Sequence, residues 1–353
     1  MLDANGNGKV DRVTATFSEA LAASTATAPW TLTNVPSSGT LATVGTAGAV
    51  ATLTLNEGAG AASTAVGSFS VQLAATAAGI RDAAGNQASF SSTTPADKAA
   101  PALLSLQMLD NNTNGRVDRV SAAFSESLAS YTAGTAPWTL ANVPSSGTLA
   151  SVGVSGTTAT LTITEGAGAQ DTAVGGFTVA LTGNASGVRD AAANLAAFAA
   201  TAPADGASPV VVSLASSGGV AGRMEAGDQL AVTFSEPLLA SSLPASTTVS
   251  ERDPSGSGND VLNITGVTNG DRDAGSNNYV TANDTTATFG SSTVASSGGV
   301  VTVTVGASCA GTGCAGIGTG QGDLSFAPAA GITDAAGNAA AATFTAATSF
   351  RLF

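Results

Sequence analysis

The sequence predicts an all-β chain of three tandem antiparallel β-sandwich modules, and two observations lead to this prediction. First, the chain is written nearly twice: residues 1–13 return at 108–120, and residues 28–42 return at 136–150 with a single change. A repeat this long is a whole domain rather than one turn of a solenoid. Second, Val, Leu, Ile and Phe recur at alternate positions in short segments between turn residues, which is typical of half-buried strands.

The repeat divides the chain into module one (1–97), module two (98–205) and module three (206–353). Module three is a diverged copy, because its segment 230–236 matches 120–126 and both end in Phe-Ser-Glu. Each module is long enough to bury its own hydrophobic core.

Two short proline-flanked linkers, 95–101 and 203–209, join the modules. Linkers this short and stiff restrict the tumbling of neighbouring modules. Module three also carries insertions at 251–285 and 305–323 that are rich in Gly, Ser, Asn and Asp. Long irregular loops on a rigid scaffold are frequent binding sites, and the alternative is tolerated drift in a stalk.

Module two has the clearest strand pattern, with seven short alternating segments at the spacing of an antiparallel sandwich. These predicted strands are 101–107, 120–125, 138–143, 149–154, 158–164, 177–181 and 196–200. In module three the alanine run 338–342 is followed at once by Thr and Phe, so it is also predicted to be a strand rather than a helix.

Module one has no counterpart of the predicted strand 101–107, because Met1 aligns with Met108 in the interior of module two. We expect the chain to begin inside a domain of something longer. The alternative is that Met1 is a true start and that a neighbouring molecule supplies the first strand.

Composition excludes several classes of function. The chain has 24 acidic and 11 basic residues and a net charge of −13, which disfavours nucleic acid and anionic membranes as partners. There is no apolar run of about 18 residues, so no membrane span is expected. The chain has no histidine, so a Ser or Cys nucleophile would lack its usual base, and we predict that the protein is not an enzyme.

Three short motifs give the chain a family resemblance. Phe-Ser-Glu follows an alternating strand, Asp-Ala-Ala-Gly-Asn precedes the last strand, and the linkers carry an Asp-x-x-x-Pro pattern. Together they resemble bacterial immunoglobulin-like (Ig-like) domains, the tandem repeats of adhesins and surface-layer proteins that include the SbsA-type Ig-like family. The resemblance covers all three modules. It implies three Ig-like sandwiches in an elongated array, an extracellular location, and a structural or adhesive role that often involves calcium.

The resemblance and the repeat together suggest a calcium-stiffened stalk or spacer whose partners are neighbouring Ig-like modules of a longer chain. Two alternatives remain open. The module three insertions could bind a host glycan or surface protein, or the chain could self-associate as a subunit of an extracellular filament or layer.

Two loops have the residue spacing of an EF-type calcium loop through its ninth position. Side-chain oxygens stand at positions 1, 3, 5 and 9, and the seventh position offers its carbonyl. The bidentate Glu of position 12 is missing, so water or a residue from another loop would have to complete the coordination. The alternative is an Asn/Gly turn between strands. The predicted ligands are Asp3, Asn5, Asn7, Lys9 and Asp11 in module one, and Asp110, Asn112, Asn114, Arg116 and Asp118 in module two.

A second set of acids is predicted to gather where modules meet. In an Ig sandwich the end of the second strand, the turn before the last strand and the incoming linker lie at one end of the domain. Carboxylates that converge there repel one another unless a cation such as calcium joins them; the alternative is that these motifs are only turns and strand ends. The predicted sets are Glu126, Asp190 and Asn194 with Asp97; Glu236, Asp334 and Asn338 with Asp205; and Glu19, Asp82 and Asn86 without a linker acid.

The two cysteines, Cys309 and Cys314, are separated by four residues and lie between Gly-rich stretches. This spacing can close a small loop through a disulfide in an oxidising compartment, whereas a metal site would need more ligands. Trp30 and Trp138 each open a strand after Ala-Pro. They are predicted to be buried core residues rather than a platform for carbohydrate.

Overall fold

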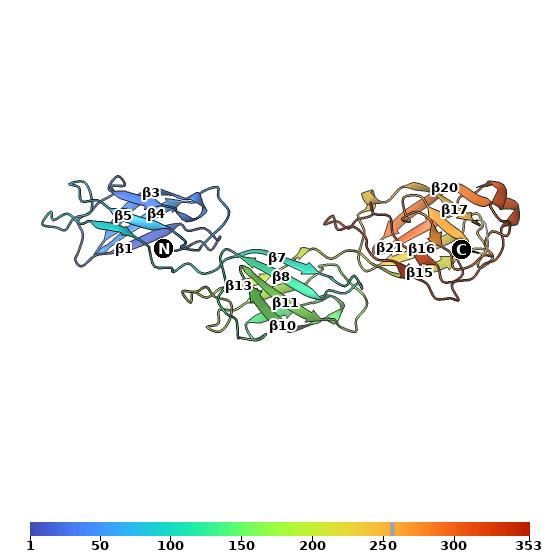
Figure 1. Ribbon diagram of the computed structural model, residues 1–353, viewed down its shortest axis with the longest axis horizontal. Coiled ribbons are helices and arrows are strands. Elements are labelled where there is room, and N and C mark those ends of the chain that lie inside the picture. Colours follow the sequence, from blue (N-terminus) through green and yellow to red (C-terminus); the bar gives the residue numbers. More distant parts are fainter. Residues whose placement is uncertain (255–257) are drawn as a thin grey trace.

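A computed structural model describes residues 1–254 and 258–353 and places them in three successive β-rich modules along an elongated chain (Figure 1). Each module has its own hydrophobic cluster, formed by residues within 1–90, 106–207 and 211–353. The helical elements of the described residues are short 3-10 turns. They are η1 (Pro36–Ser38), η2 (Pro144–Ser146), η3 (Ala240–Ser242) and η4 (Thr312–Gly316).

Module one consists of two three-stranded antiparallel sheets whose inward positions share one core. In β4 the burial alternates residue by residue, so Ala51, Leu53 and Leu55 point inward while the intervening threonines do not. The first sheet has the order β1 (Arg12–Thr16), β4 (Val50–Asn56), β3 (Thr40–Ala47). The second has the order β2 (Trp30–Thr33), β5 (Ser70–Leu73), β6 (Phe90–Thr93).

Module two repeats this plan with two further strands in its first sheet. That sheet has the order β10 (Thr148–Ser155), β11 (Thr158–Thr164), β8 (Arg119–Phe124), β7 (Leu103–Leu109), β14 (Ala204–Asp205). All its pairs are antiparallel except β14, which runs parallel to β7. The second sheet has the order β13 (Phe198–Thr201), β12 (Thr178–Leu181), β9 (Trp138–Ala141).

Module three has a larger sheet. Its path runs β15 (Val211–Ser217), β16 (Gln229–Phe234), β21 (Val300–Thr304), β20 (Thr286–Ser297), β17 (Ser246–Arg252), β18 (Val261–Ile264), β19 (Arg272–Asp273), and β22 (Cys309–Ala310) pairs with β20. A separate pair joins β23 (Ser325–Phe326) and β24 (Phe344–Thr345). Tyr279 and Phe326 are among the largest side chains buried in its core.

The predicted strands of module two overlap β7 to β13, and Trp30 and Trp138 are both 6% exposed in the cores. Each Trp ring packs edge-on against a phenylalanine of the last strand, Phe90 or Phe198, with ring centroids 5.8 Å apart. The fold is therefore all-β, as the alternation predicts.

Two expectations for module three are wrong. The run 338–342 is not a strand: only isolated bridges form at Ala339 and Ala341, because alanine side chains supply too little cross-strand packing to extend them. The insertion 251–285 is not irregular throughout, because it contains β18 and β19, which extend the main sheet beyond β17. Residues 255–257 of that insertion lie outside the described residues.

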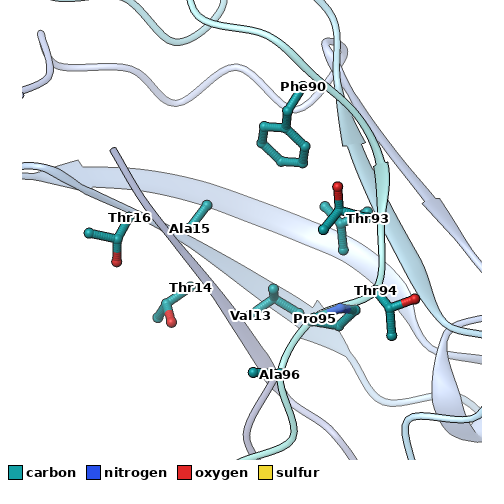
Figure 2. A pocket seen from close by; sticks show the side chains of 10 residues that line it. Val13, Thr14, Ala15, Thr16, Phe90, Thr93, Thr94, Pro95 and Ala96 are labelled. Carbon is teal, nitrogen blue, oxygen red and sulfur yellow. The ribbon is translucent and has the colours of Figure 1, made fainter. Parts of the chain in front are cut away.

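Module one differs from module two at one edge of its first sheet. In module two, β8 lies between β11 and β7, whereas its counterpart β1 pairs with β4 alone apart from a single bridge at Leu2. The space that β7 fills in module two is an open groove in module one. Figure 2 shows this groove, which is lined by residues of β1, by Phe90 and Thr93 of β6, and by Pro95.

Candidate metal centres at the module junctions

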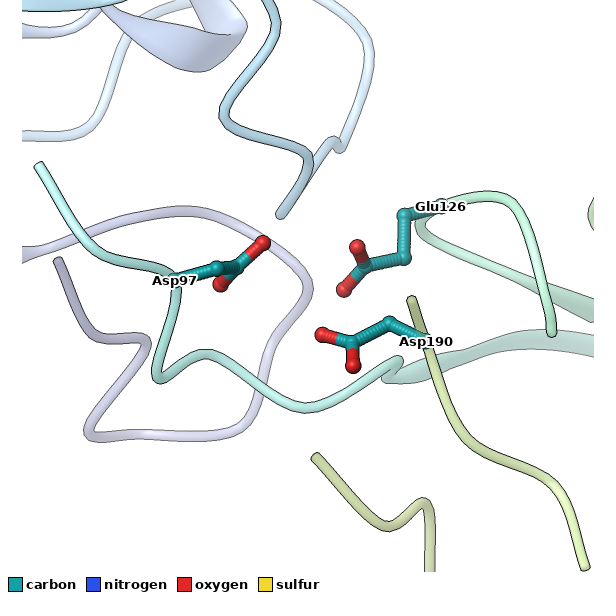
Figure 3. Close-up of side chains that lie close together, drawn as sticks. All are labelled: Asp97, Glu126 and Asp190. Carbon is teal, nitrogen blue, oxygen red and sulfur yellow. The ribbon is translucent and has the colours of Figure 1, made fainter. Parts of the chain in front are cut away.

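Three carboxylates meet where module one joins module two. Asp97 comes from the linker, Glu126 follows the end of β8, and Asp190 lies in the turn before β13. One oxygen of each lies within 4.8 Å of the others, and Figure 3 shows the three carboxylates pointing toward one another. We call this set the first triad. Glu126 is 6% exposed and Asp190 2% exposed, so the charges are largely removed from water.

The junction of modules two and three carries the same arrangement. Asp205 in β14, Glu236 after β16 and Asp334 in the turn after β23 also bring one oxygen each within 4.8 Å. We call this set the second triad. Glu236 is 5% exposed and Asp334 2% exposed. The recurrence at two junctions indicates that the geometry belongs to the junction rather than to one loop.

The turn aspartates are fixed by asparagines four residues later. Asp190 accepts hydrogen bonds from the backbone N–H of Asn194 at 2.8 Å and from its side-chain amide at 2.6 Å. Asp334 is held by Asn338 in the same way, at 2.8 and 2.7 Å. This is a local side-chain turn, which explains the recurring Asp-x-x-x-Asn spacing. Asn194 and Asn338 therefore position the acids.

A chain of hydroxyl groups joins module one to the first triad. The backbone N–H of Ala102 donates to Ser125 Oγ at 2.9 Å, and Ser125 Oγ lies 2.6 Å from Thr64 Oγ1. Thr64 Oγ1 in turn donates to Glu126 Oε1 at 2.6 Å. Because Thr64 has a single proton, its bond to Glu126 requires Ser125 to donate to Thr64. Thr64 is fully buried, so residues of two modules share one hydrogen-bond chain.

The second junction repeats this chain of bonds with equivalent residues. Val210 N–H donates to Ser235 Oγ at 2.9 Å, Ser235 Oγ lies 2.6 Å from Thr172 Oγ1, and Thr172 donates to Glu236 Oε1 at 2.6 Å. Thr172 is also fully buried. The Ser and Glu of the Phe-Ser-Glu motif are therefore both bonded to a threonine of the preceding module.

Burial and mutual repulsion disfavour the ionised forms of the triad carboxylates. Burial raises the pKa of Glu126 to about 7, and the charges of Asp97 and Asp190 add to the rise while Thr64 opposes it. Burial likewise raises the pKa of Glu236 to about 8, with smaller contributions from Asp205 and Asp334. The pKa values of Asp97 and Asp205 are also raised, chiefly by burial. Clustered oxygens whose charges repel are the donor set that a hard divalent cation relieves.

Module one has the turn residues but not the junction. Asp82 is held by Asn86 at 2.8 and 2.6 Å, as in the other modules. Glu19 is exposed, and no linker acid or threonine of another module reaches it within the described chain. The glutamate of the Phe-Ser-Glu motif is therefore buried in modules two and three, where another module packs against it, and exposed in module one.

The loop 3–11 of module one is closed by its own hydrogen bonds. Asp3 accepts from the backbone N–H groups of Gly6 at 2.8 Å and Gly8 at 2.7 Å. The side-chain oxygens of Asn5 and Asn7 accept from N–H groups two residues further on. In this arrangement the oxygens accept hydrogen bonds from the backbone of the same loop.

The loop 110–118 of module two has the same internal bonds. Asp110 accepts from Gly115 N–H at 2.8 Å, and Asn112 and Asn114 each accept from an N–H two residues on. At the seventh position, Arg116 donates to the carbonyl of Gly166 at 2.6 Å, and its counterpart Lys9 donates to that of Gly58 at 2.7 Å. These two cations fasten the loops to the strand-end loop beside them.

Each loop also faces a glutamate from another part of its module. Glu57 accepts from the amides of Asn5 and Asn7 at 2.7 Å, and Glu165 accepts from Asn112 and Asn114 at 2.8 Å. They stand where a residue from another loop was expected to replace the missing position 12. One oxygen of Asp11 and one of Asp118 are buried without a hydrogen-bond partner.

Sequence reasoning missed four of these residues, Thr64, Thr172, Glu57 and Glu165. The repeat itself holds their signal, since Thr-Ala-Val-Gly occurs at 64–67 and 172–175, and Glu-Gly-Ala-Gly-Ala at 57–61 and 165–169.

In module three, Cys309 of β22 and Cys314 of η4 form a disulfide.

Comparison with protein-family models, curated proteins and solved structures found no match to this chain. Among the described residues the helices are single short turns, and none has the length or apolar character of a transmembrane helix. The junction geometry is therefore the main evidence for function.

Proposed function

We propose that the chain is a non-catalytic extracellular stalk or spacer, made of three Ig-like sandwiches and stiffened by calcium at its module junctions. In this proposal it is part of a bacterial surface adhesin or surface-layer protein. The observation that carries the proposal is the recurrence of one hydrogen-bonded junction, with a buried triad of carboxylates, between both pairs of modules. A device built twice between modules suits a role in setting the angle between them.

Calcium is the cation that the donor set favours. Every donor in the triads is a carboxylate oxygen, and the hydroxyl groups of Thr64 and Thr172 are bonded to the triad glutamates. Calcium binds six to eight such oxygens in flexible geometry, whereas zinc prefers nitrogen and sulfur ligands. A bound ion would turn the repulsion among Asp97, Glu126 and Asp190 into a link between the linker and module two. Thr64 would carry that link into module one.

Counting bound ions tests the proposal. Equilibrium dialysis against calcium, after removal of metal with a chelator, should give two fewer ions per chain for the double variant Glu126→Gln/Glu236→Gln than for wild type, one for each triad. Glu19→Gln is the matched control, because Glu19 occupies the same motif but is exposed. Equal ion counts for wild type and the double variant would contradict the assignment of calcium to the triads.

A second candidate function is assembly by strand addition, and the groove of module one favours it. In module two the equivalent space holds β7, whose Leu106 is 5% exposed in the core and whose Leu103 packs against the same cluster. The occupant we propose for module one is therefore an extended segment from a neighbouring molecule with leucines spaced as in β7, pairing antiparallel to β1. Such pairing would join subunits into a filament or layer.

A peptide with the sequence of residues 101–107 tests this candidate. Saturable binding to the full chain, with hydrogen-exchange protection appearing in β1, is the expected result. A control peptide with serine in place of both groove leucines should not bind. Failure of the first peptide to bind, together with a monomeric chain and a folded module one at high concentration, would remove this candidate and leave the stalk proposal untouched.

A further inference from the structure

Module three buries a glutamate with no hydrogen-bond partner. Glu251 lies near the end of β17, a strand paired on both sides, and faces Leu262 of β18 and Ala287 of β20 in the register. All three residues are fully buried. Neither carboxylate oxygen of Glu251 has a hydrogen-bond partner among the described residues. An unpaired carboxylate in such surroundings is strongly unfavourable, so something must neutralise or ligate it.

A second buried carboxylate, Asp260, directly precedes β18, in which Val261 pairs with Arg252 and Leu262 pairs with Glu251. Asp260 is fully buried, and its Oδ2 accepts from the backbone N–H groups of Tyr279 at 2.8 Å and Val280 at 3.0 Å. Its own backbone is fixed by bonds to Ser276 at 2.7 Å and Ala274 at 2.9 Å. Its Oδ1 has no partner. The two N–H donors favour the ionised form and leave one oxygen free for a ligand.

The surroundings of the pair contain more negative charge and no paired cation. Burial raises the pKa of Glu251 to about 8, and the charge of Asp260 adds to this rise. The pKa of Asp260 is raised by burial and by Asp253, which is 5% exposed, although the N–H bonds oppose the rise. The ion pairs of the described residues involve neither Glu251 nor Asp260. Three unpartnered carboxylate oxygens therefore remain enclosed in this part of module three.

We propose that Glu251 and Asp260 bind a divalent cation of the calcium class inside module three, with Asp253 beside them. The site is separate from the junction triads and does not depend on them. Hard oxygen donors in an enclosed space are the environment that calcium prefers, and a cation bound between the two carboxylates would give their free oxygens a partner. The cation would join β17 to the loop that holds Asp260, and so fasten the insertion 251–285 to the main sheet.

The test uses the full chain and calcium alone as the probe. Ions bound per chain are counted by equilibrium dialysis, and the unfolding transition of module three is followed by calorimetry with calcium or with chelator. Glu251→Gln and Asp260→Asn should each bind one ion fewer than wild type and show a smaller calcium-dependent rise in the melting temperature of module three, the remaining rise coming from the second triad. Asp284→Asn, an exposed acid of the same module, is the control and should behave as wild type.

The chelator condition separates a metal site from a carboxylate that is merely protonated. With a cation site, wild-type module three melts at a lower temperature in chelator than in calcium. At a pH above the Glu251 pKa of about 8, Glu251→Gln melts higher than wild type in chelator because a buried charge is gone. If the variant loses the transition altogether, Glu251→Met replaces it, since methionine has a similar volume without charge. Equal ion counts for wild type and variants, or a module three transition unaffected by chelator, would overturn the proposal.

Discussion

Modules one and two are near-copies in sequence, but they differ in two places. One is the free edge of the first sheet, and the other is the glutamate of the Phe-Ser-Glu motif. In module two, β7 covers β8, and Glu126 is buried against Thr64 of module one. In module one the same sheet edge is open, and Glu19 of the same motif is exposed. The difference teaches that the buried carboxylate site is a property of two adjoining modules. One module supplies Glu126 and Asp190, the linker supplies Asp97, and the neighbouring module supplies the hydroxyl bond from Thr64.

The largest effect should come from removing the strand contact that module two has and module one lacks. Leu106→Ala should lower the free energy of unfolding of module two by about 3 kcal/mol, because it leaves a cavity where β7 meets the core. Leu104→Ala is the control, since Leu104 is 44% exposed and its loss should cost less than about 0.5 kcal/mol. Urea denaturation and calorimetry each measure the change in the free energy of unfolding for both variants. Similar losses for the two variants would show that β7 does not pack against the core of module two as described.

The next effect should come from the hydroxyl bond between modules. Thr64→Val should reduce the stability of module two, when joined to module one, by about 2 kcal/mol, because Glu126 and Ser125 lose a buried partner. The exposed strand residue Thr54 provides the control Thr54→Val, which should change little. Calorimetry on the full chain makes the measurement. If both valine variants melt like wild type, the hydroxyl chain does not stabilise the junction.

A smaller effect should distinguish the two EF-type loops. Gly8 and Gly115 have positive φ angles of 85° and 82°, so alanine at either should cost about 1 kcal/mol. Only at Gly8 would the new methyl group also meet module two, 2.8 Å from Leu104 Cδ2. Gly8→Ala should therefore loosen the junction, shortening the rotational correlation time of module one measured by NMR relaxation, whereas Gly115→Ala should not. An equal effect of both variants on tumbling would contradict this contact.

The smallest effect should be a pH dependence of the metal-free chain. Because burial raises the pKa of Glu126 from 4.5 to about 7, the folded protein retains a proton that the unfolded chain has released between these values. Stability therefore falls in chelator as pH rises from about 4.5 to about 7, and the higher pKa of Glu236 extends the fall to about 8. Calcium should flatten the curve. Chemical denaturation at several pH values tests this, and Glu126→Gln/Glu236→Gln, which cannot titrate at these positions, should show a shallower slope.

Much of the fold could be predicted from local pattern, because alternation in segments such as 158–164 reflects which side chains face the core. Contacts between modules were harder to predict from the sequence. Thr64 and Glu126 lie 62 residues apart, and nothing near Thr64 indicates a partner in another module. Glu57 was missed for the same reason, since it reaches Asn5 and Asn7 from about 50 positions away.

Glu251 illustrates a different limit of the sequence. The repeat alignment ends at the insertion, so Glu251 is interpreted as the start of a loop, whereas β17 runs through Arg252 and keeps Glu251 in phase with buried Val249. The alternation Thr247, Val249, Glu251 contains the signal. A charged residue on the inward face contradicts the usual pattern, and only the structure shows that the strand continues that far.

Small-angle X-ray scattering of the full chain, in calcium and then in chelator, tests the central claim most directly. In calcium we expect a stiff rod of about 100–120 Å, the length of the three β-rich modules end to end. In chelator the profile should be that of three modules that move about their linkers. Glu126→Gln/Glu236→Gln should give this flexible profile in both conditions. A wild-type scattering profile unchanged by chelator would contradict calcium stiffening of the junctions.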